Sequence, residues 1–225
     1  MVKRKKSYIK KINQLDTLSV HAGVKTDPLT GAVMTPIYAT STYAHDRPGE
    51  HKGYEYSRSQ NPTREVLENS IAELESGYKA FAFASGVAAQ TAVLDLLKPG
   101  DHVIAFDDLY GGTFRLFNEI KSKSSNIEFT FVDLNTNFSK EIKKNTKMIW
   151  IETPTNPLLK ITDLKRIARI ARKNKLITVC DNTFATPYNQ RPLEHGIDIV
   201  NHSTTKYING HSDVIGGALV IGKNK

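Results

Sequence analysis

The sequence predicts an α/β fold with a mostly parallel sheet and helices on both faces. From Pro62 onward, short apolar segments alternate with segments that have helical periodicity. Strands joined by helical crossovers favour parallel pairing, and a parallel sheet of this kind carries helices on both faces. The expected strands are residues 80–84, 102–106, 127–132, 148–152, 177–180, 197–201 and 217–221.

Helices are expected between these strands, where apolar residues recur at helical spacing. Pro62 suits the first turn of a helix, and Leu67, Ile71 and Leu74 mark one apolar face after it. The same periodicity recurs further along the chain. One expected helix begins at Pro62, and the others cover residues 87–97, 113–122 and 163–174.

Residues 1–60 are predicted to form an extended N-terminal arm, and residues 61–225 the α/β domain. The arm is rich in Gly, Pro, Thr and Tyr and shows little periodicity. The chain has 39% hydrophobic and 24% charged residues, which is typical of a soluble globular protein. Its single cysteine, Cys180, excludes an intramolecular disulfide, and no apolar stretch is long enough to span a membrane. We therefore expect a cytoplasmic protein with no membrane partner.

The net charge of +8 is concentrated near the N-terminus. Six of the lysines and arginines lie within the first eleven residues: Lys3, Arg4, Lys5, Lys6, Lys10 and Lys11. Such a run binds nucleic acid in some proteins, but here no aromatic ladder or reader motif accompanies it. We interpret it as a solvated arm and expect no nucleic-acid partner.

Ligands of parallel α/β sheets bind at the carboxyl ends of the strands, so the residues that follow each strand matter most. Ser85-Gly86-Val87 is a glycine turn that opens a helix, which suits either a phosphate or a plain helix cap. Tyr110 is followed by two glycines, which allow close approach to a ligand. Asn156 is held between two prolines. No G-x-G-x-x-G or G-x-x-x-x-G-K-[ST] motif supports a dinucleotide or nucleoside triphosphate.

The last two expected sites follow the fifth and sixth strands. Asp181 lies at a buried strand end, where a carboxylate must be paired or hydrogen-bonded. Lys206 is preceded by three hydroxyl residues, an unusual composition for a surface. Ser203-x-x-Lys206 also fits the serine β-lactamase pattern, but the chain has no K-T-G motif and has Cys180-Asp181-Asn182 in place of S-D-N.

Together, these segments resemble the Cys/Met metabolism family of fold-type I enzymes that depend on pyridoxal 5'-phosphate (PLP). The resemblance runs from about residue 16 to the last residue. It implies an aspartate aminotransferase-like, PLP-binding large domain for residues 61–225. The most specific segments are 54–64 and 203–213, supported by 84–86, 108–113, 152–157 and 181–184.

The resemblance also implies roles for individual residues. Lys206 would hold PLP as a Schiff base and move protons, and Asp181 would pair with the ring nitrogen. Tyr110 would stack on the ring and act as an acid or base towards the leaving group, so Lys206 and Tyr110 are the expected catalytic residues. The expected cofactor contacts are Tyr56, Arg58, Ser85, Gly86, Val87, Tyr110, Asn156, Asp181, Thr183, Ser203, Thr205 and Lys206.

Other residues are expected to contact the amino-acid substrate or to link subunits. Glu55 would read the substrate's distal amino group, and Asn156 would contact the ring oxygen or the substrate carboxylate. Tyr56 and Arg58 come from the neighbouring subunit in relatives, which implies a homo-oligomer, a tetramer in those proteins. The seven histidines are scattered without metal-ligand spacing, so we expect no metal.

The implied reaction is a PLP-dependent carbon–sulfur lyase or transferase reaction at the γ-carbon of cystathionine or an activated homoserine. Cystathionine γ-lyase ranks ahead of γ-synthase. Methionine γ-lyases carry a cysteine where this chain has Gly112, so that activity ranks lower, as does cystathionine β-lyase. Relatives continue into a C-terminal domain that binds the substrate α-carboxylate through an arginine, and we expect that domain to be absent. The alternative is a truncated, catalytically inactive fragment of such an enzyme.

Overall fold

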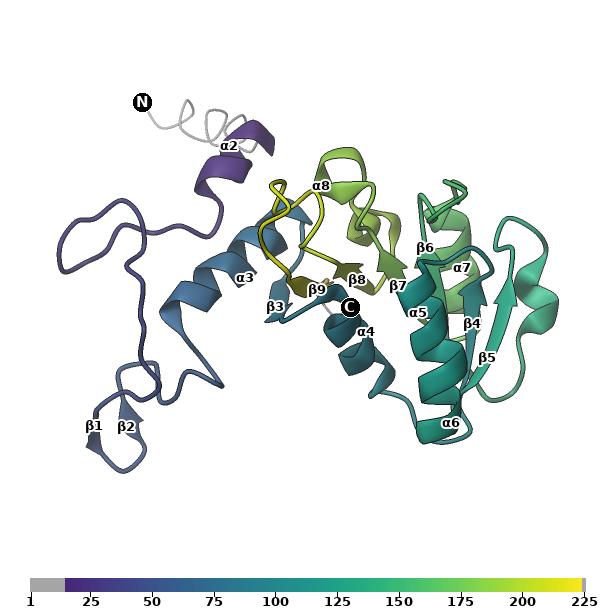
Figure 1. Ribbon diagram of the computed structural model, residues 1–225, viewed down its shortest axis with the longest axis horizontal. Coiled ribbons are helices and arrows are strands. Elements are labelled where there is room, and N and C mark those ends of the chain that lie inside the picture. Colours follow the sequence, from purple (N-terminus) through teal and green to yellow (C-terminus); the bar gives the residue numbers. More distant parts are fainter. Residues whose placement is uncertain (1–14, 224–225) are drawn as a thin grey trace. The chain divides into compact units, whose positions relative to one another are not determined.

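Residues 15–223 are described by a computed structural model, in which the chain divides into two compact units after Leu74 (Figure 1). The division falls after Leu74 rather than at residue 60, because the helix that begins at Pro62 belongs to the first unit. That helix is bonded to the segment before it: the Ser70 hydroxyl donates to the Ala22 carbonyl at 2.5 Å. The basic segment near the N-terminus lies outside the described residues.

The first unit contains more regular structure than an extended arm. Its elements are α2 (Leu15–His21), β1 (His45–Arg47), β2 (Glu50–His51) and α3 (Pro62–Leu74). Strands β1 and β2 form an antiparallel ribbon. Neither α2 nor the ribbon contains a buried residue, so no apolar periodicity in the sequence predicts these elements.

The second unit is built on a seven-stranded sheet with the order β3-β9-β8-β7-β6-β4-β5. Strand β9 runs antiparallel to its neighbours β3 and β8, and the other pairs are parallel. The strands are β3 (Lys79–Phe83), β4 (His102–Phe106), β5 (Glu128–Val132), β6 (Thr146–Glu152), β7 (Ile177–Asp181), β8 (Ile199–His202) and β9 (Gly217–Ile221).

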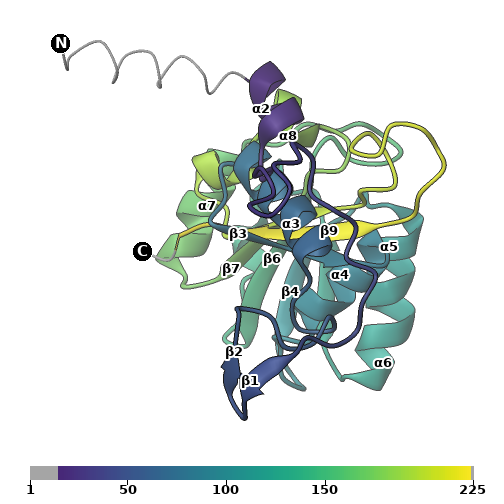
Figure 2. The same cartoon turned by 90° about the vertical axis from the view of Figure 1, so that its left-hand side faces the viewer.

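Helices cover both faces of this sheet, α4 and α5 on one face and α7 on the other (Figures 1 and 2). This confirms the predicted α/β fold with a mostly parallel sheet. The region expected as one helix over 113–122 is a continuous run of α5, a π-helix and α6. The elements are α4 (Gly86–Leu94), α5 (Gly111–Arg115), η1 (Leu116–Lys121), α6 (Ser122–Ser124), η2 (Phe138–Glu141), α7 (Leu164–Lys173), α8 (Thr186–Asn189) and η3 (Pro192–His195).

The core of the second unit lies between the sheet and its helices. Strand β4 is buried along its whole length, which is typical of a central strand covered on both faces. On α7 the apolar face is buried, and the N-cap Asp163 accepts a hydrogen bond from the Arg166 amide. Between residues 15 and 223, no helix has the length and apolar character needed to cross a membrane.

The register of the sheet brings polar residues together at its carboxyl edge. Glu152 of β6 pairs with Asp181 of β7, and Asp181 pairs with Asn201 of β8. Three neighbouring parallel strands therefore carry a carboxylate or an amide at their last or next-to-last residue, at the edge where ligands of such sheets bind.

Candidate active site

A pocket of about 310 Å³ lies at this carboxyl edge, and all its lining residues belong to the second unit. The volume falls in the range of small-molecule sites. The lining includes every cofactor contact that the sequence predicted between Ser85 and Lys206. The full set is Ser85, Gly86, Val87, Gln90, Tyr110, Glu152, Pro154, Asn156, Asp181, Thr183, Phe184, Ser203, Thr205, Lys206 and Ile215.

One wall of the pocket is the beginning of helix α4. Ser85 caps the helix by accepting a hydrogen bond from the Ala88 amide at 3.0 Å. Gly86 lies so close to the end of β8 that a Cβ there would be 2.8 Å from the Ser203 Cβ. The N–H groups of Gly86 and Val87 belong to the first turn, where a helix offers no internal acceptor. The wall therefore favours an anion such as a phosphate.

The segment after β8 supplies hydroxyl groups and an amine. The Thr205 hydroxyl donates to the Gly216 carbonyl at 3.2 Å and accepts from the Gly216 amide at 3.0 Å, which fixes its position. The Ser203 amide donates to the Thr183 hydroxyl at 2.9 Å. Lys206 lines the pocket and is exposed, so its amine is accessible to a ligand.

Asp181 forms the floor at the end of β7 and is 7% exposed. Three donors point at its carboxylate: the Asn201 amide at 2.8 Å, the Gln90 amide at 3.3 Å and the Thr183 backbone N–H at 3.0 Å. The sequence analysis required a hydrogen-bonded carboxylate here, and the structure has one. Its orientation is fixed, and it presents negative charge to the pocket.

Glu152 is a second buried carboxylate beside Asp181, and the sequence analysis did not predict it as a site residue. Its two oxygens accept hydrogen bonds from the Tyr110 amide at 3.1 Å and the Asn156 amide at 2.8 Å. Burial, followed by the negative charge of Asp181, raises the pKa of Glu152 to about 8.

Tyr110 stands at the start of α5 and is 46% exposed. Its ring lies directly against Gly112, because a Cβ on that glycine would collide with the ring carbons. The side chain of Tyr110 can therefore reach over the pocket only because residue 112 is a glycine.

Three of the predicted site residues belong to the first unit. The Arg58 guanidinium lies 5.0 Å from the centre of the Tyr56 ring, a cation–π arrangement. Glu55 Oε1 lies 3.1 Å from His51 Nε2. The roles of Glu55, Tyr56 and Arg58 stay predictions.

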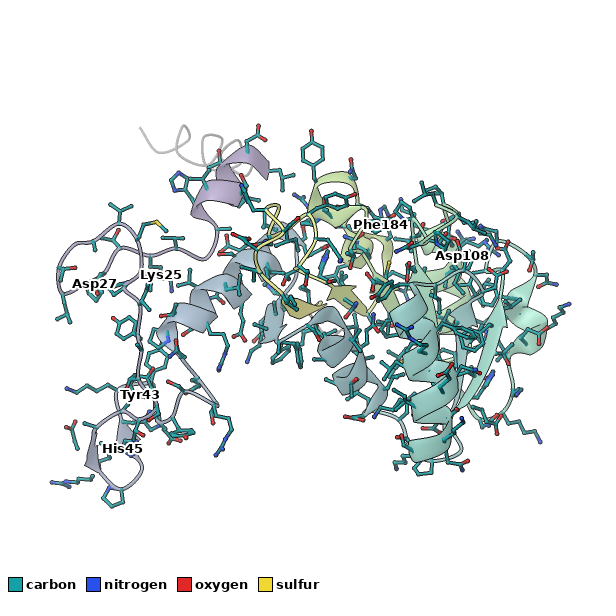
Figure 3. The ribbon with its side chains drawn as sticks, in the orientation of Figure 1. Lys25, Asp27, Tyr43, His45, Asp108 and Phe184 are labelled. Carbon is teal, nitrogen blue, oxygen red and sulfur yellow. The ribbon has the colours of Figure 1, made fainter. Side chains whose placement is uncertain are left out.

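Of the lining residues that the sequence analysis missed, Gln90 and Glu152 carried a weak signal. Gln90 is a polar residue one helical turn after Gly86 in a mostly apolar helix, and Glu152 ends a mostly buried strand. Phe184 and Ile215 had no signal, because their position depends on loop conformation. Figure 3 shows Phe184 and Asp108 at the same edge of the sheet.

The chemistry of these groups fits PLP. A helix start with hydroxyls suits its phosphate, an accessible amine suits its aldehyde carbon, and a fixed carboxylate suits its ring nitrogen. An aromatic side chain at the rim suits its ring face. Among residues 15–223, no cluster of three or more His, Cys, Asp or Glu side chains is arranged to hold a metal ion.

Comparison with known families and proteins gives one consistent result. Residues 16–225 match the family described as Cys/Met metabolism PLP-dependent enzyme. The chain is 58% identical over 217 residues to "Cystathionine beta-lyase" of Coxiella burnetii, covering 96% of this chain and 56% of that protein. It is 54% identical over 206 residues to "Cystathionine gamma-lyase" of Bacillus subtilis, covering 91% of this chain and 54% of that protein.

Solved structures give the same picture. The crystal structure of metB from Corynebacterium glutamicum matches with a TM-score of 0.91 and 46% identity, covering 93% of this chain and 55% of that one. Cystathionine gamma-lyase from Lactobacillus plantarum, complexed with L-serine, matches with a TM-score of 0.90 and 47% identity over the same shares. The chain thus spans about half the length of these relatives.

Proposed function

The chain belongs to the Cys/Met metabolism PLP-dependent enzyme family, and we propose that it forms the cofactor-binding part of an enzyme acting on cystathionine. The observation that carries the proposal is the pocket, which unites Lys206, Asp181 and the start of α4 at one edge of the sheet. When bound, PLP supplies an electron sink for negative charge that develops on the carbons of the amino-acid substrate.

In this proposal, the residues of the pocket divide the binding of the cofactor among them. Lys206 holds it covalently, and Asp181 keeps its ring nitrogen protonated. The N–H groups of Gly86 and Val87 bind the phosphate together with the hydroxyls of Ser203 and Thr205. Ser85 and Thr183 are further proposed contacts of the cofactor. The three hydrogen bonds to Asp181 support its role, because they hold the carboxylate in one orientation.

Proton transfer falls to Lys206 and Tyr110. The Lys206 amine takes the proton from the substrate Cα, and the Tyr110 hydroxyl assists departure of the sulfur group. Asn156 contacts the cofactor oxygen or the substrate carboxylate, and Glu55 binds the distal amino group. The contact between the Tyr110 ring and Gly112 supports a ring held over the pocket.

The proposal includes a homo-oligomer in which Tyr56 and Arg58 reach the phosphate of a neighbouring subunit, with a tetramer as in relatives. The cation–π contact between them supports a shared function for the pair. A cytoplasmic location is also proposed, supported by a single, buried cysteine.

The proposed reaction is at the γ-carbon, with cystathionine γ-lyase ahead of γ-synthase. β-Lyase activity is the second candidate, because a relative that is 58% identical carries that name. The products separate the three: cysteine with 2-oxobutanoate and ammonia for γ-lyase, homocysteine with pyruvate and ammonia for β-lyase, and cystathionine from cysteine and an activated homoserine for γ-synthase.

The first test compares the absorbance of the purified chain with that of its Lys206→Ala variant after addition of PLP. We expect a yellow band that survives gel filtration in the unchanged chain and is lost in the variant, because Lys206 is the lysine that lines the pocket. Cystathionine is then added, and the 2-oxo acid product is identified. A folded chain that retains no PLP, or a Lys206→Ala variant with the same band, would contradict the proposal.

A further inference from the structure

We propose that Glu152 is a positioning residue that holds the Tyr110 loop and the Asn156 loop together as one unit around the pocket. The Tyr110 loop is defined as residues 107–112, after β4, and the Asn156 loop as residues 153–161, after β6. The proposal rests on the proposed function only in that these loops would flank the bound cofactor.

The geometry of the carboxylate carries the inference. Oε2 accepts the Tyr110 N–H at 3.1 Å, while Oε1 accepts the Asn156 N–H at 2.8 Å. Each loop thus uses a different oxygen of one side chain that is 5% exposed. Because Glu152 itself ends β6, both loops are tied to the edge of the sheet. A shift of either loop would remove the carboxyl acceptor from a part-buried backbone N–H, which is unfavourable.

A second carboxylate joins the same two loops, but farther from the pocket. Asp108 Oδ2 accepts the Leu158 N–H at 3.0 Å and also the Thr155 hydroxyl. Neither Thr155 nor Leu158 lines the pocket, whereas Tyr110 and Asn156 both do. The Asp108 contacts therefore stiffen the loops, and the Glu152 contacts set the two residues that face the ligand.

The location of Glu152 argues for a role that a carboxyl group fulfils and a carboxamide does not. It lies in register with Asp181, and two buried carboxylates side by side repel each other. Burial and this repulsion raise the pKa of Glu152, so the position is electrostatically unfavourable. A glutamine would remove the repulsion, but its NH₂ group only donates and would face one of the two N–H donors, whereas both oxygens of a carboxyl group have acceptor capacity. The requirement for two acceptors accounts for a glutamate here.

Hydrogen exchange followed by mass spectrometry tests the inference on the chain without PLP. In Glu152→Ala, we expect faster exchange in both loops and unchanged exchange in the neighbouring strands β4 and β7. Glu152→Gln is expected to release one loop, because its single oxygen serves one donor. The matched control is Asp107→Asn, which removes a surface ion pair at 3.0 Å between Asp107 of the Tyr110 loop and Lys160 of the Asn156 loop. The control is expected to leave exchange at Tyr110 and Asn156 unchanged.

The second readout is retention of PLP. Losing one part-buried hydrogen bond at each flanking residue is expected to weaken PLP binding about tenfold in Glu152→Ala, and PLP binding to Asp107→Asn is expected to be unchanged. Unchanged exchange in both loops of Glu152→Ala would overturn the inference, as would an increase spread evenly over the sheet. If Glu152→Ala does not fold, the one-loop release in Glu152→Gln decides. If the unchanged chain binds no PLP, the proposed function fails while the exchange result still judges the role of Glu152.

Discussion

A buried histidine lies at each end of the sheet, and the two differ in how completely their ring nitrogens are hydrogen-bonded. At the amino end, His102 contacts the Thr146 hydroxyl through Nδ1 at 2.8 Å and the Thr130 hydroxyl through Nε2 at 2.9 Å. At the carboxyl end, His202 Nε2 lies 2.5 Å from Glu75 Oε1, and its Nδ1 has no hydrogen-bond partner within residues 15–223. Both side chains are fully buried. Both ring nitrogens of His102 therefore have hydrogen-bond partners, whereas Nδ1 of His202 has none within the described residues.

The cluster at the carboxyl end lies directly behind the pocket. The Asn182 amide donates to Glu75 at 2.7 Å and to the Gln190 carbonyl at 2.8 Å. Asn182 follows Asp181 in the chain, and His202 precedes Ser203. His102 and its two partners do not line the pocket, whereas the cluster at the carboxyl end holds the backbone next to the lining residues Asp181 and Ser203.

The largest effect should come from removing Glu75. In Glu75→Ala, His202 and Asn182 lose a shared acceptor in a fully buried place, so we expect the free energy of unfolding to fall by about 3 kcal/mol. Urea denaturation followed by circular dichroism measures it. A loss below about 1 kcal/mol would remove the distinction between this cluster and an ordinary surface pair.

A smaller effect concerns the pH dependence of stability at the carboxyl end. The pKa of Glu152 is raised to about 8 by burial, and the nearby carboxylates Asp181 and Asp108 add to the shift. The folded chain therefore keeps a proton that the unfolded chain releases, and stability falls as the pH rises from the ordinary range of a glutamate to about 8. The contribution to the slope is at most about 1.4 kcal/mol per pH unit. Urea midpoints across this range should flatten in Glu152→Gln; identical slopes in both proteins would refute it.

The smallest effect is expected at the amino end, where stability should change with pH in the opposite direction. Burial lowers the pKa of His102, helped by Lys143 and opposed by Glu128 and Glu141. The folded chain resists protonation there, so stability is lost as the pH falls below the ordinary range of a histidine. In His102→Gln, the decline in urea midpoint on the acidic side should be shallower. A steeper decline would mean that the two ends do not titrate in opposite directions.

Much of the fold could be predicted because its pattern is local. Strands β4 and β9 have the predicted bounds, since each is a short apolar run between turns. Helix α7 was predicted from its apolar face, within one residue of each end. The short elements α2 and α8 were not predicted, because they are too short to repeat an apolar face.

The site divides in the same way. Asp181 and Lys206 could be found because each carries unusual chemistry at a strand end. Glu152 carried only a weak signal, because its hydrogen bonds come from two loops that are far apart in the sequence. The contact between Glu75 and His202 joins residues 127 positions apart, and no local pattern in the sequence links them.

The antiparallel strand β9 has a consequence for the order in which the protein can fold. Strand β3 begins the sheet in the sequence, yet within residues 15–223 its partner in the sheet is β9, which follows the other six strands in the chain. Strand β8 likewise waits for β9 on one side. While a ribosome is still translating the residues up to Ile221, β3 has no place to dock and one edge of β8 stays open. Closure of the sheet, and with it the meeting of Gly217 with Ser85 beside the pocket, therefore cannot begin until β9 has left the ribosome.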